Sequence, residues 1–468
     1  MTRLLTSFSA LLVASTVLAE PTLPAPQEAI ADPTLAELIR QSLARRPELR
    51  AAEDLARAER ERIPQAGALQ DPTLSLGLQN DGFRGIQIGK MESSFWQVMV
   101  TQPLPWPGKR SLRTEVAATG ARLADAALLR ARLSAEADVR REYLDLLLVR
   151  DRMALLGRLE SLWVKAEGLA RSRYEAGDGA QSDVLRAQLE RNRLRQRRWS
   201  LEAEERTRVQ ALNRLRSHEL DEPISTTATI LDLGLPPVPG EAEALKDAEQ
   251  RSPELLSARL QAERSTSLVA LARRERYPDL AVTAAIMPRG GLEPMWQAGL
   301  SVSLPVFAGR KQDRALAERE ARAAASGSAV ETVAQVLHQR VLERLALLRS
   351  LVESAHIYQE GLLVQSQATA DSTLAQYRVG RLTFASVLEA IAGVIDDEDG
   401  FLATVASARR VAISAAEVSL DPSGAGTGPL AGGAMPGTGA MSRGGTTAAA
   451  TTSGGGEIAP PSSSMSKM

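Results

Sequence analysis

Two stretches of this sequence, far apart in the chain, follow the same short pattern. Residues 173–188 read RYEAGDGAQSDVLRAQ, and residues 376–391 read QYRVGRLTFASVLEAI. In both, a Tyr-x-x-Gly step is followed a few residues later by Val-Leu. A single copy is explained by the stereochemistry of a helical hairpin alone. Two copies in matched surroundings indicate that the chain was duplicated and that each half makes the same sharp turn.

Other landmarks recur in the same order in both halves. RRPELRAAEDLARAER, which begins at Arg45, resembles QRSPELLSARLQAER, which begins at Gln250. WQVMVTQPLPWPGKR, which begins at Trp96, resembles WQAGLSVSLPVFAGR, which begins at Trp296. Because all the landmarks keep their order, we infer that the chain consists of two versions of one plan.

Composition excludes several classes of function. The chain has 468 residues, a formal net charge of −1 and no cysteine. Disulfides, thiolate metal sites and a cysteine nucleophile are therefore absent, and no strong field attracts nucleic acid. The three histidines lie far apart in sequence, which argues against a histidine metal site. No nucleotide-binding loop, Ser-His-Asp set or metal-binding helix is present, so we expect neither catalysis nor a cofactor.

The N-terminus has the pattern of a secretory signal peptide. Arg3 precedes an apolar run that extends from Leu4 to Leu18, and Val17 and Ala19 suit the positions before a cleavage site. An ordinary N-terminal helix is the alternative. Export predicts that the mature protein works beyond the inner membrane.

The chain divides into six segments. They are a signal peptide at 1–19, a linker at 20–33, a first repeat at 34–225, a linker at 226–240, a second repeat at 241–420 and a tail at 421–468. The tail is rich in Gly, Ser, Thr and Ala, so we expect it to be disordered. A soft-metal role for its methionines is the alternative.

Each repeat contains two segments with the alternation of β-strands. We predict strands at about 72–80, 94–104, 279–287 and 295–305. In the first, Leu74, Leu76 and Leu78 share one face and Ser75 and Gly77 the other. Segments of this length with one apolar face fit tilted strands that cross an outer membrane. A soluble hairpin with one wet face is the alternative. Trp96 and Trp296 begin their strands, where membrane-interface aromatics are expected.

Long helices are predicted on either side of these strands. A first helix extends from about Thr34 to Ile63, and helical hairpins occupy about 110–216 and 310–418. At 1.5 Å per residue, a helix from Arg110 to Glu175 is roughly 100 Å long. Apolar residues spaced by three and four predict lengthwise packing of these helices. These residues are Val139, Tyr143, Leu146, Val149, Met153, Leu156, Leu159, Leu162, Ala166 and Leu169, and then Val341, Leu345, Leu348, Val352, Ala355 and Leu362.

The repeated motif marks the turn of each hairpin. Gly177 and Gly380 supply the positive-φ position that ends one helix and lets the chain return. Asp183 and Ser386 lie where a cap of the returning helix is expected.

Four strands cannot form a closed barrel, because a membrane barrel needs at least eight. An open edge in lipid would leave unpaired backbone groups. The chain must therefore oligomerise, or it is not a membrane protein. A trimer would have twelve strands and twelve helical passes around an aqueous passage.

The signal peptide, the duplicated plan, the paired strands, QPLPWPGKR, SLPVFAGR and the two Tyr-x-x-Gly tips resemble the TolC-type outer-membrane efflux factors. The resemblance covers about residues 34–420. It implies a mainly helical homotrimer, with a transmembrane barrel of twelve strands continued by a periplasmic barrel of twelve helices. QPLPWPGKR is most similar to the branch that exports heavy-metal cations.

The resemblance also implies a location, partners and functional positions. The protein would lie in the lipid of the outer membrane of a Gram-negative-type cell, extend into the periplasm, and bind a periplasmic adaptor and an inner-membrane transporter through its tips. Nucleic acid is not an expected partner. Expected docking and gate residues are Tyr174, Gly177, Asp183, Val184, Leu185, Tyr377, Gly380, Arg381, Val387 and Leu388.

Glu389 and Ser386 are the positions at which a pore constriction is expected. Ser386 and Leu382 stand where the family can have Asp and a gating Arg, so a cation-binding ring and the usual gate bonds are not assured. A ring of Glu389 side chains would favour the passage of cations. A solvated helix carboxylate is the alternative.

Two classes of function remain open on these residues. The first is a passive exit duct of a tripartite efflux pump, which opens when its tip helices shift. The second is a periplasmic coiled-coil adaptor or scaffold without a membrane barrel, although an adaptor would need only one long hairpin. The substrate cannot be read from the chain, because the pump selects it.

Overall fold

The computed structural model describes residues 32–421. All of these residues belong to one compact unit. The predicted signal peptide, most of the first linker and nearly all of the predicted tail lie outside the described residues.

The two repeats have the same order of elements. The first contains α1 (Pro33–Arg45), α2 (Pro47–Gly67), β1 (Thr73–Gln79), β2 (Phe95–Leu104), α3 (Lys109–Glu175) and α4 (Gln181–Leu215). The short helix α5 (Ile230–Leu233) lies in the segment that we predicted as a linker. The second contains α6 (Glu241–Arg251), α7 (Pro253–Arg274), β3 (Asp279–Arg289), β4 (Leu292–Ser303), α8 (Gln312–Ile357), the π-helix η1 (Tyr358–Leu362), α9 (Leu363–Arg378) and α10 (Phe384–Glu417).

The prediction of a single first helix was wrong. The chain breaks at Arg46, which adopts an extended conformation (φ −62°, ψ 123°) before Pro47. The ring of a proline disfavours a helical conformation in the residue before it, which explains the break. Ser252 breaks the second repeat in the same way before Pro253. The repeated Pro-Glu-Leu motif thus starts a new helix in each half.

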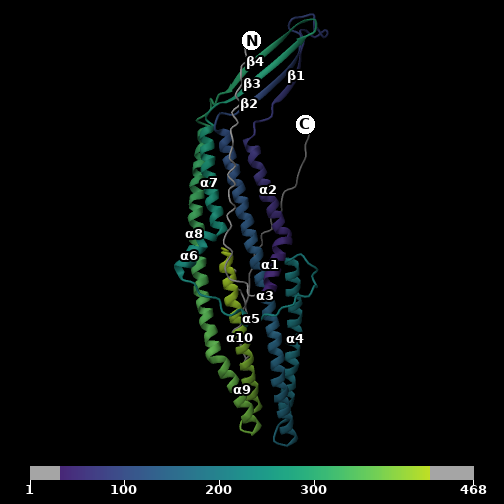
Figure 1. Ribbon diagram of the computed structural model, residues 1–468, viewed down its shortest axis with the longest axis vertical. Helices are drawn as coiled ribbons and strands as arrows, with labels where there is room; N and C mark the ends of the chain where they lie inside the picture. The colour runs from purple at the N-terminus through teal and green to yellow at the C-terminus, as the bar shows by residue number, and fades with distance from the viewer. Residues whose placement is uncertain (1–31, 422–468) are drawn as a thin grey trace, which may run out of the picture. The chain divides into compact units, whose positions relative to one another are not determined.

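The strands form one antiparallel sheet in the order β1-β2-β3-β4. Figure 1 shows the strands side by side at one end of the helices, with the two hairpin turns at the other end. Leu76 pairs with Val98, Val98 with Ile286, and Ile286 with Trp296, so one face is apolar across all four strands. These side chains are exposed: Leu74, Leu76, Leu78, Trp96, Val98, Val100, Val282, Ile286, Trp296, Leu300 and Val302.

The opposite face of the sheet is polar or small over most of its length. It carries Ser75, Gly77, Gln97, Thr101, Thr283, Gln297, Gly299 and Ser301. Toward the ends of the strands away from the helices, Phe95, Ala285 and Met287 form a small buried cluster on this face. The sheet therefore exposes its apolar face, and its few buried side chains lie on the opposite, mostly polar face.

The QPLPWPGKR motif forms the junction between β2 and α3. The Trp106 ring stacks on Tyr277 with centroids 5.6 Å apart. The Lys109 ammonium donates to the Asp279 carboxylate and to the Tyr277 carbonyl, each at 2.8 Å. Arg110 donates twice to the carbonyl of Gly67. The motif thus fixes the angle between a strand and the longest helix of the described chain.

The helices pack along α3, which contacts α2, α4, α7 and α10. Most of the predicted apolar stripe of α3 is buried, including Tyr143, Leu146 and Leu159 at 1% exposure or less. In the second repeat the prediction was wrong at Leu362, which is 37% exposed, whereas its neighbour Leu363 packs against the core. The π-helix shifts the phase of the apolar stripe by one residue, which the 3.6-residue period could not anticipate.

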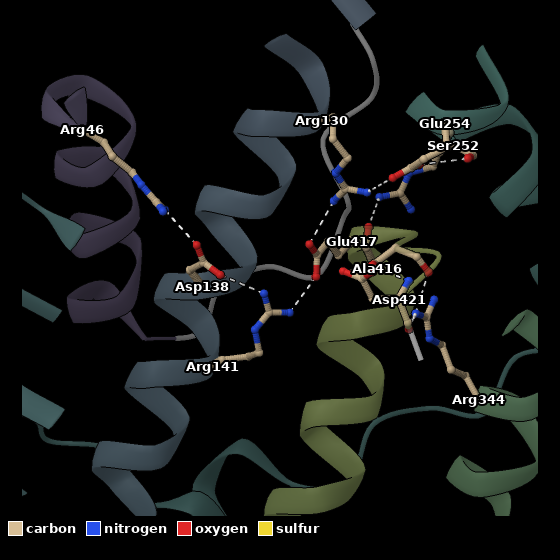
Figure 2. A network of polar contacts seen from close by, with 12 residues as sticks. Arg46, Arg130, Asp138, Arg141, Ser252, Glu254, Arg344, Ala416, Glu417 and Asp421 are labelled. Carbon is tan, nitrogen blue, oxygen red and sulfur yellow. Dashed lines mark hydrogen bonds and ion pairs between the residues drawn. The ribbon is translucent and has the colours of Figure 1, made fainter. Parts of the chain in front are cut away.

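A network of ion pairs joins the two repeats at the end of α10 (Figure 2). The Glu417 carboxylate is 7% exposed and accepts from Arg130 at 3.0 Å and from Arg141 at 2.6 Å. Arg130 also binds Glu254 of α7, and Arg141 also binds Asp138 of α3. One buried carboxylate of the second repeat thus binds two arginines of the first.

Candidate functional site

The first hairpin tip ends α3 with a glycine-terminated turn. Gly177 has a φ of 82°, and its N–H donates to the Tyr174 carbonyl at 3.0 Å. The N–H of Asp178 donates to the Arg173 carbonyl at 2.9 Å. This pair of bonds is the Schellman motif, which needs a left-handed residue after the helix.

The second tip repeats the same geometry. Gly380 has a φ of 77°, and its N–H donates to the Tyr377 carbonyl at 3.0 Å. The N–H of Arg381 donates to the Gln376 carbonyl at 2.9 Å. The sequence motif therefore encodes a helix stop, and its glycine is the residue that the stop requires.

The two tip tyrosines have different environments. Tyr377 is 1% exposed, whereas Tyr174 is 46% exposed. The Tyr377 ring packs on Phe384, and its hydroxyl donates to the Asp183 carboxylate of the other tip at 3.1 Å. Burial and the Asp183 charge raise the pKa of the Tyr377 hydroxyl to about 12, so it remains a donor at physiological pH.

Arg173 connects the two tips a second time. Its guanidinium donates to the Tyr377 carbonyl and to the Asp178 carbonyl, each at 2.9 Å, and lies 4.7 Å from the centre of the Tyr377 ring. A cation at the carboxyl end of α9 also interacts favourably with the helix dipole. Both tips of one copy are thus held together by Arg173 and by the bond between Tyr377 and Asp183.

A buried carboxylate stabilises the first hairpin behind its tip. Glu167 of α3 accepts from Arg191 at 2.6 Å and from Gln188 at 3.1 Å, both on α4, and from Arg171 at 3.1 Å. The Arg191 hydrogen bond is the main cause that lowers the pKa of Glu167. Neither Glu167 nor Arg173 was singled out from the sequence, since each looks like an ordinary charged residue on a helix.

The predicted capping roles were wrong. The residues at the N-cap positions of α4 and α10 are Ala180 and Thr383, and neither makes a side-chain cap bond. Asp183 lies within the first turn of α4 and accepts from Tyr377 instead. Ser386 lies within the first turn of α10, with its hydroxyl 3.4 Å from that of Thr383.

The remaining predicted tip residues fall into two groups. Val387 is fully buried, and Val184 and Leu388 pack against the core. Leu185, Arg381 and Glu389 are exposed, and Glu389 has no ion pair within residues 32–421. Trp96 and Trp296 are both exposed on the apolar face of the sheet, far from the tips along the chain.

Within the described part of the chain, no group of three or more histidine or acidic side chains could hold a metal ion. Across residues 32–421, no helix is long and apolar enough to cross a membrane.

Comparison with known proteins shows the family. The family model described as "Outer membrane efflux protein" matches residues 38–218 and 244–400. The chain belongs to the outer membrane efflux protein family. This confirms the resemblance to TolC-type factors and the predicted outer-membrane location with an extension into the periplasm. The family consists of channel proteins rather than enzymes.

Solved structures of outer-membrane efflux channels share the fold. The chain is 18% identical to CusC, with a TM-score of 0.70 over 83% of this chain and 91% of that one. It is 17% identical to VceC from Vibrio cholerae (TM-score 0.68, covering 83% and 97%). It is 18% identical to MtrE from Neisseria gonorrhoeae (TM-score 0.65, covering 83% and 89%). No curated protein matches the sequence.

The bond between the two tips of this efflux protein can be tested directly. Tyr377→Phe removes the hydroxyl that binds Asp183, which costs about 1.4 kcal/mol and raises the opening equilibrium of the second tip about tenfold. Amide hydrogen exchange of residues 384–388 measures this. Tyr174→Phe is the matched control, because the Tyr174 hydroxyl makes no hydrogen bond in residues 32–421. Equal exchange in both variants would contradict the assigned bond.

Proposed function

We propose that this protein is the exit duct of a tripartite efflux pump, a homotrimer that conducts substrate passively across the outer membrane. The observation that carries the proposal is the exposed apolar face of the four-stranded sheet. Exposed patches of this kind mark surfaces that meet lipid or another protein. Alternating strands with an apolar outer face are typical of outer-membrane barrels.

The edges of the sheet support assembly from several copies. Within residues 32–421, β1 and β4 each pair on one side only. In lipid, the free backbone groups of both edges must find partners. Pairing β4 of one copy with β1 of the next supplies them, and three copies give a barrel of twelve strands continued by the helical hairpins.

The tips are proposed as the gate and as the docking surface for an adaptor and an inner-membrane transporter. Their exposed residues, Tyr174, Leu185, Arg381 and Glu389, are available for such contacts in a single copy. The buried Tyr377 and the Arg173 bonds hold the tips of each copy together. Exposure of Glu389 leaves it free to line the bore as a constriction residue.

Heavy-metal cations are the substrate class that we propose to test first. The support from the sequence is the similarity of QPLPWPGKR to the heavy-metal branch. In the structure these residues form a junction between strand β2 and helix α3, where Trp106 stacks on Tyr277 and Lys109 binds Asp279. Growth of a deletion strain on copper, zinc, cobalt and common antibiotics identifies the class.

The test of the duct uses the full-length protein in detergent and in planar bilayers. We expect an assembly of three chains that migrates as an oligomer in an unheated denaturing gel and dissociates on heating. We also expect it to conduct ions across a bilayer. A stable, lipid-free monomer recovered from the periplasm would overturn the proposal and favour an adaptor or scaffold.

A further inference from the structure

The methionines of the described chain are concentrated in the sheet. Residues 32–421 contain five of them, which are Met91, Met99, Met153, Met287 and Met295. Met99 lies in β2, Met287 in β3 and Met295 in β4. Met99 pairs with Ala285, which is two residues from Met287, and alternate residues of a strand share a face. Three of the five thioethers therefore lie on the mostly polar face of one sheet.

The register of the strands brings these three side chains together. Met287 and Met295 are direct partners in the β3–β4 ladder, and Met99 is diagonal to Met287 across β2 and β3. Directly opposite Cβ atoms lie about 5 Å apart, and diagonal neighbours about 7–8 Å apart, within reach of long side chains. Met99 and Met295 both pack against the buried group of Phe95, Ala285 and Met287. The three residues thus form one group, here called the methionine cluster.

The surroundings of the methionine cluster favour a soft cation. Flanking positions on the same face carry amide, hydroxyl or small side chains, which are Ser75, Gln97, Thr101, Thr283, Gln297 and Gly299. The amide nitrogen of Gln97 lies 4.0 Å from the sulfur of Met99. Glu293, the acidic residue nearest along the chain, lies where the β3–β4 register is irregular. Carboxylates suit hard ions and imidazole suits zinc, whereas thioethers select Cu(I).

Packing alone is the other explanation for the methionine cluster, since methionine fills irregular space in protein cores. The buried group on this face has only three members, so little core is present to fill. Met99 and Met295 are partly exposed, which leaves their thioethers accessible to an ion. The face that they share is also the one that would enclose water in the proposed barrel. These observations favour a binding role.

We propose that Met99, Met287 and Met295 form a thioether site for a soft monovalent cation, Cu(I) or its analogue Ag(I), on the inner wall of the duct. The inference rests on the proposed function for its place in export, because this face lines a passage only if the sheet closes into a barrel. The coordination itself belongs to one copy. The site lies in the sheet, at the end of the molecule opposite the hairpin tips (Figure 1). The ion would leave by exchange of ligands, with no change in its oxidation state.

The test measures silver binding by the full-length protein in detergent. Ag⁺ is the probe because it keeps its oxidation state in air, and the buffer contains nitrate because chloride precipitates silver. Methionines of the tail could also bind the probe. All measurements therefore use a background that carries Met435→Leu, Met441→Leu, Met465→Leu and Met468→Leu. Equilibrium dialysis against silver nitrate gives the affinity and the number of bound ions.

We expect about one Ag⁺ per chain in this background, since the three thioethers form a single donor set. Met287→Leu should weaken binding at least about tenfold, because loss of a second-shell partner alone costs 10–100-fold at metal sites. Leucine preserves the apolar volume, so the oligomer should persist in an unheated gel. Met153→Leu is the matched control, because Met153 packs against the helical core, and it should leave binding unchanged. Zn²⁺ should not bind at this site.

X-ray absorption at the silver edge should show sulfur neighbours around the bound ion. Neighbours of oxygen or nitrogen alone, equal binding by the Met287→Leu and Met153→Leu variants, or equal affinity for Zn²⁺ would overturn the site. Bilayer conductance of the same samples separates this failure from that of the proposed function. Sulfur-bound silver without conductance contradicts the duct and leaves the site, whereas normal conductance without silver binding contradicts the site alone.

Discussion

Glu417→Gln is expected to destabilise the folded protein by about 3 kcal/mol, since removal of one member of a buried ion-pair network leaves the other charges without a full partner. Arg130 and Arg141 both bind this carboxylate, which is 7% exposed. Arg130 keeps its ion pair with Glu254, and Arg141 keeps its ion pair with Asp138, which limits the loss of folding free energy. Guanidinium unfolding followed by circular dichroism measures the change.

The control for this prediction is Glu343→Gln, which removes a carboxylate from an exposed ion pair. Glu343 binds Arg340 on the same helix and is 47% exposed. Glu343→Gln should leave the unfolding midpoint unchanged, because exposed pairs contribute little to stability. If Glu417→Gln proved as stable as this control, the network in Figure 2 would not contribute to the stability of the fold as assigned here.

Leu300→Arg is expected to prevent stable assembly in the outer membrane. Leu300 is 66% exposed on the apolar face of β4. An arginine near the middle of a bilayer-facing strand costs about 2–4 kcal/mol per copy. The measurement is the amount of oligomer that stays intact when the outer-membrane fraction is run on a denaturing gel without heating.

Ser301→Arg provides the matched control one residue away. Ser301 lies on the opposite, polar face of the same strand, where a barrel would enclose water. We expect this variant to assemble normally. Equal loss of oligomer in both variants would show that the apolar face does not contact lipid while the polar face contacts water. It would favour a soluble sheet.

Sequence patterns predicted the repeated architecture because its signals are local. Alternating residues such as Leu74, Leu76 and Leu78 share a face in any extended strand. Tyr-x-x-Gly at each tip corresponds to one backbone geometry, the Schellman turn at Gly177 and Gly380. The paired segments at Arg45 and Gln250 likewise mark equivalent helix breaks, although the breaks themselves were not predicted.

Contacts between distant residues could not be predicted in this way. Arg173 reaches Tyr377 across 204 positions, and nothing local distinguishes it from the other arginines. The prediction that Asp183 caps a helix considered only its neighbours in sequence, whereas its partner is Tyr377. Leu362 was wrongly assigned to the buried apolar stripe because η1 changes the helical period, and nothing in the amino-acid composition indicates a π-helix.

Within residues 32–421, β1 and β4 each have one unpaired edge, so the proposed assembly would leave each newly exported chain vulnerable before it meets other copies. Free strand edges and uncovered leucine, valine and isoleucine are templates for aggregation in water. A lone copy in the periplasm therefore needs protection by a chaperone or rapid capture by a partner chain. Overproduction should yield degraded or insoluble material, and the cell must match synthesis of this protein to its rate of insertion.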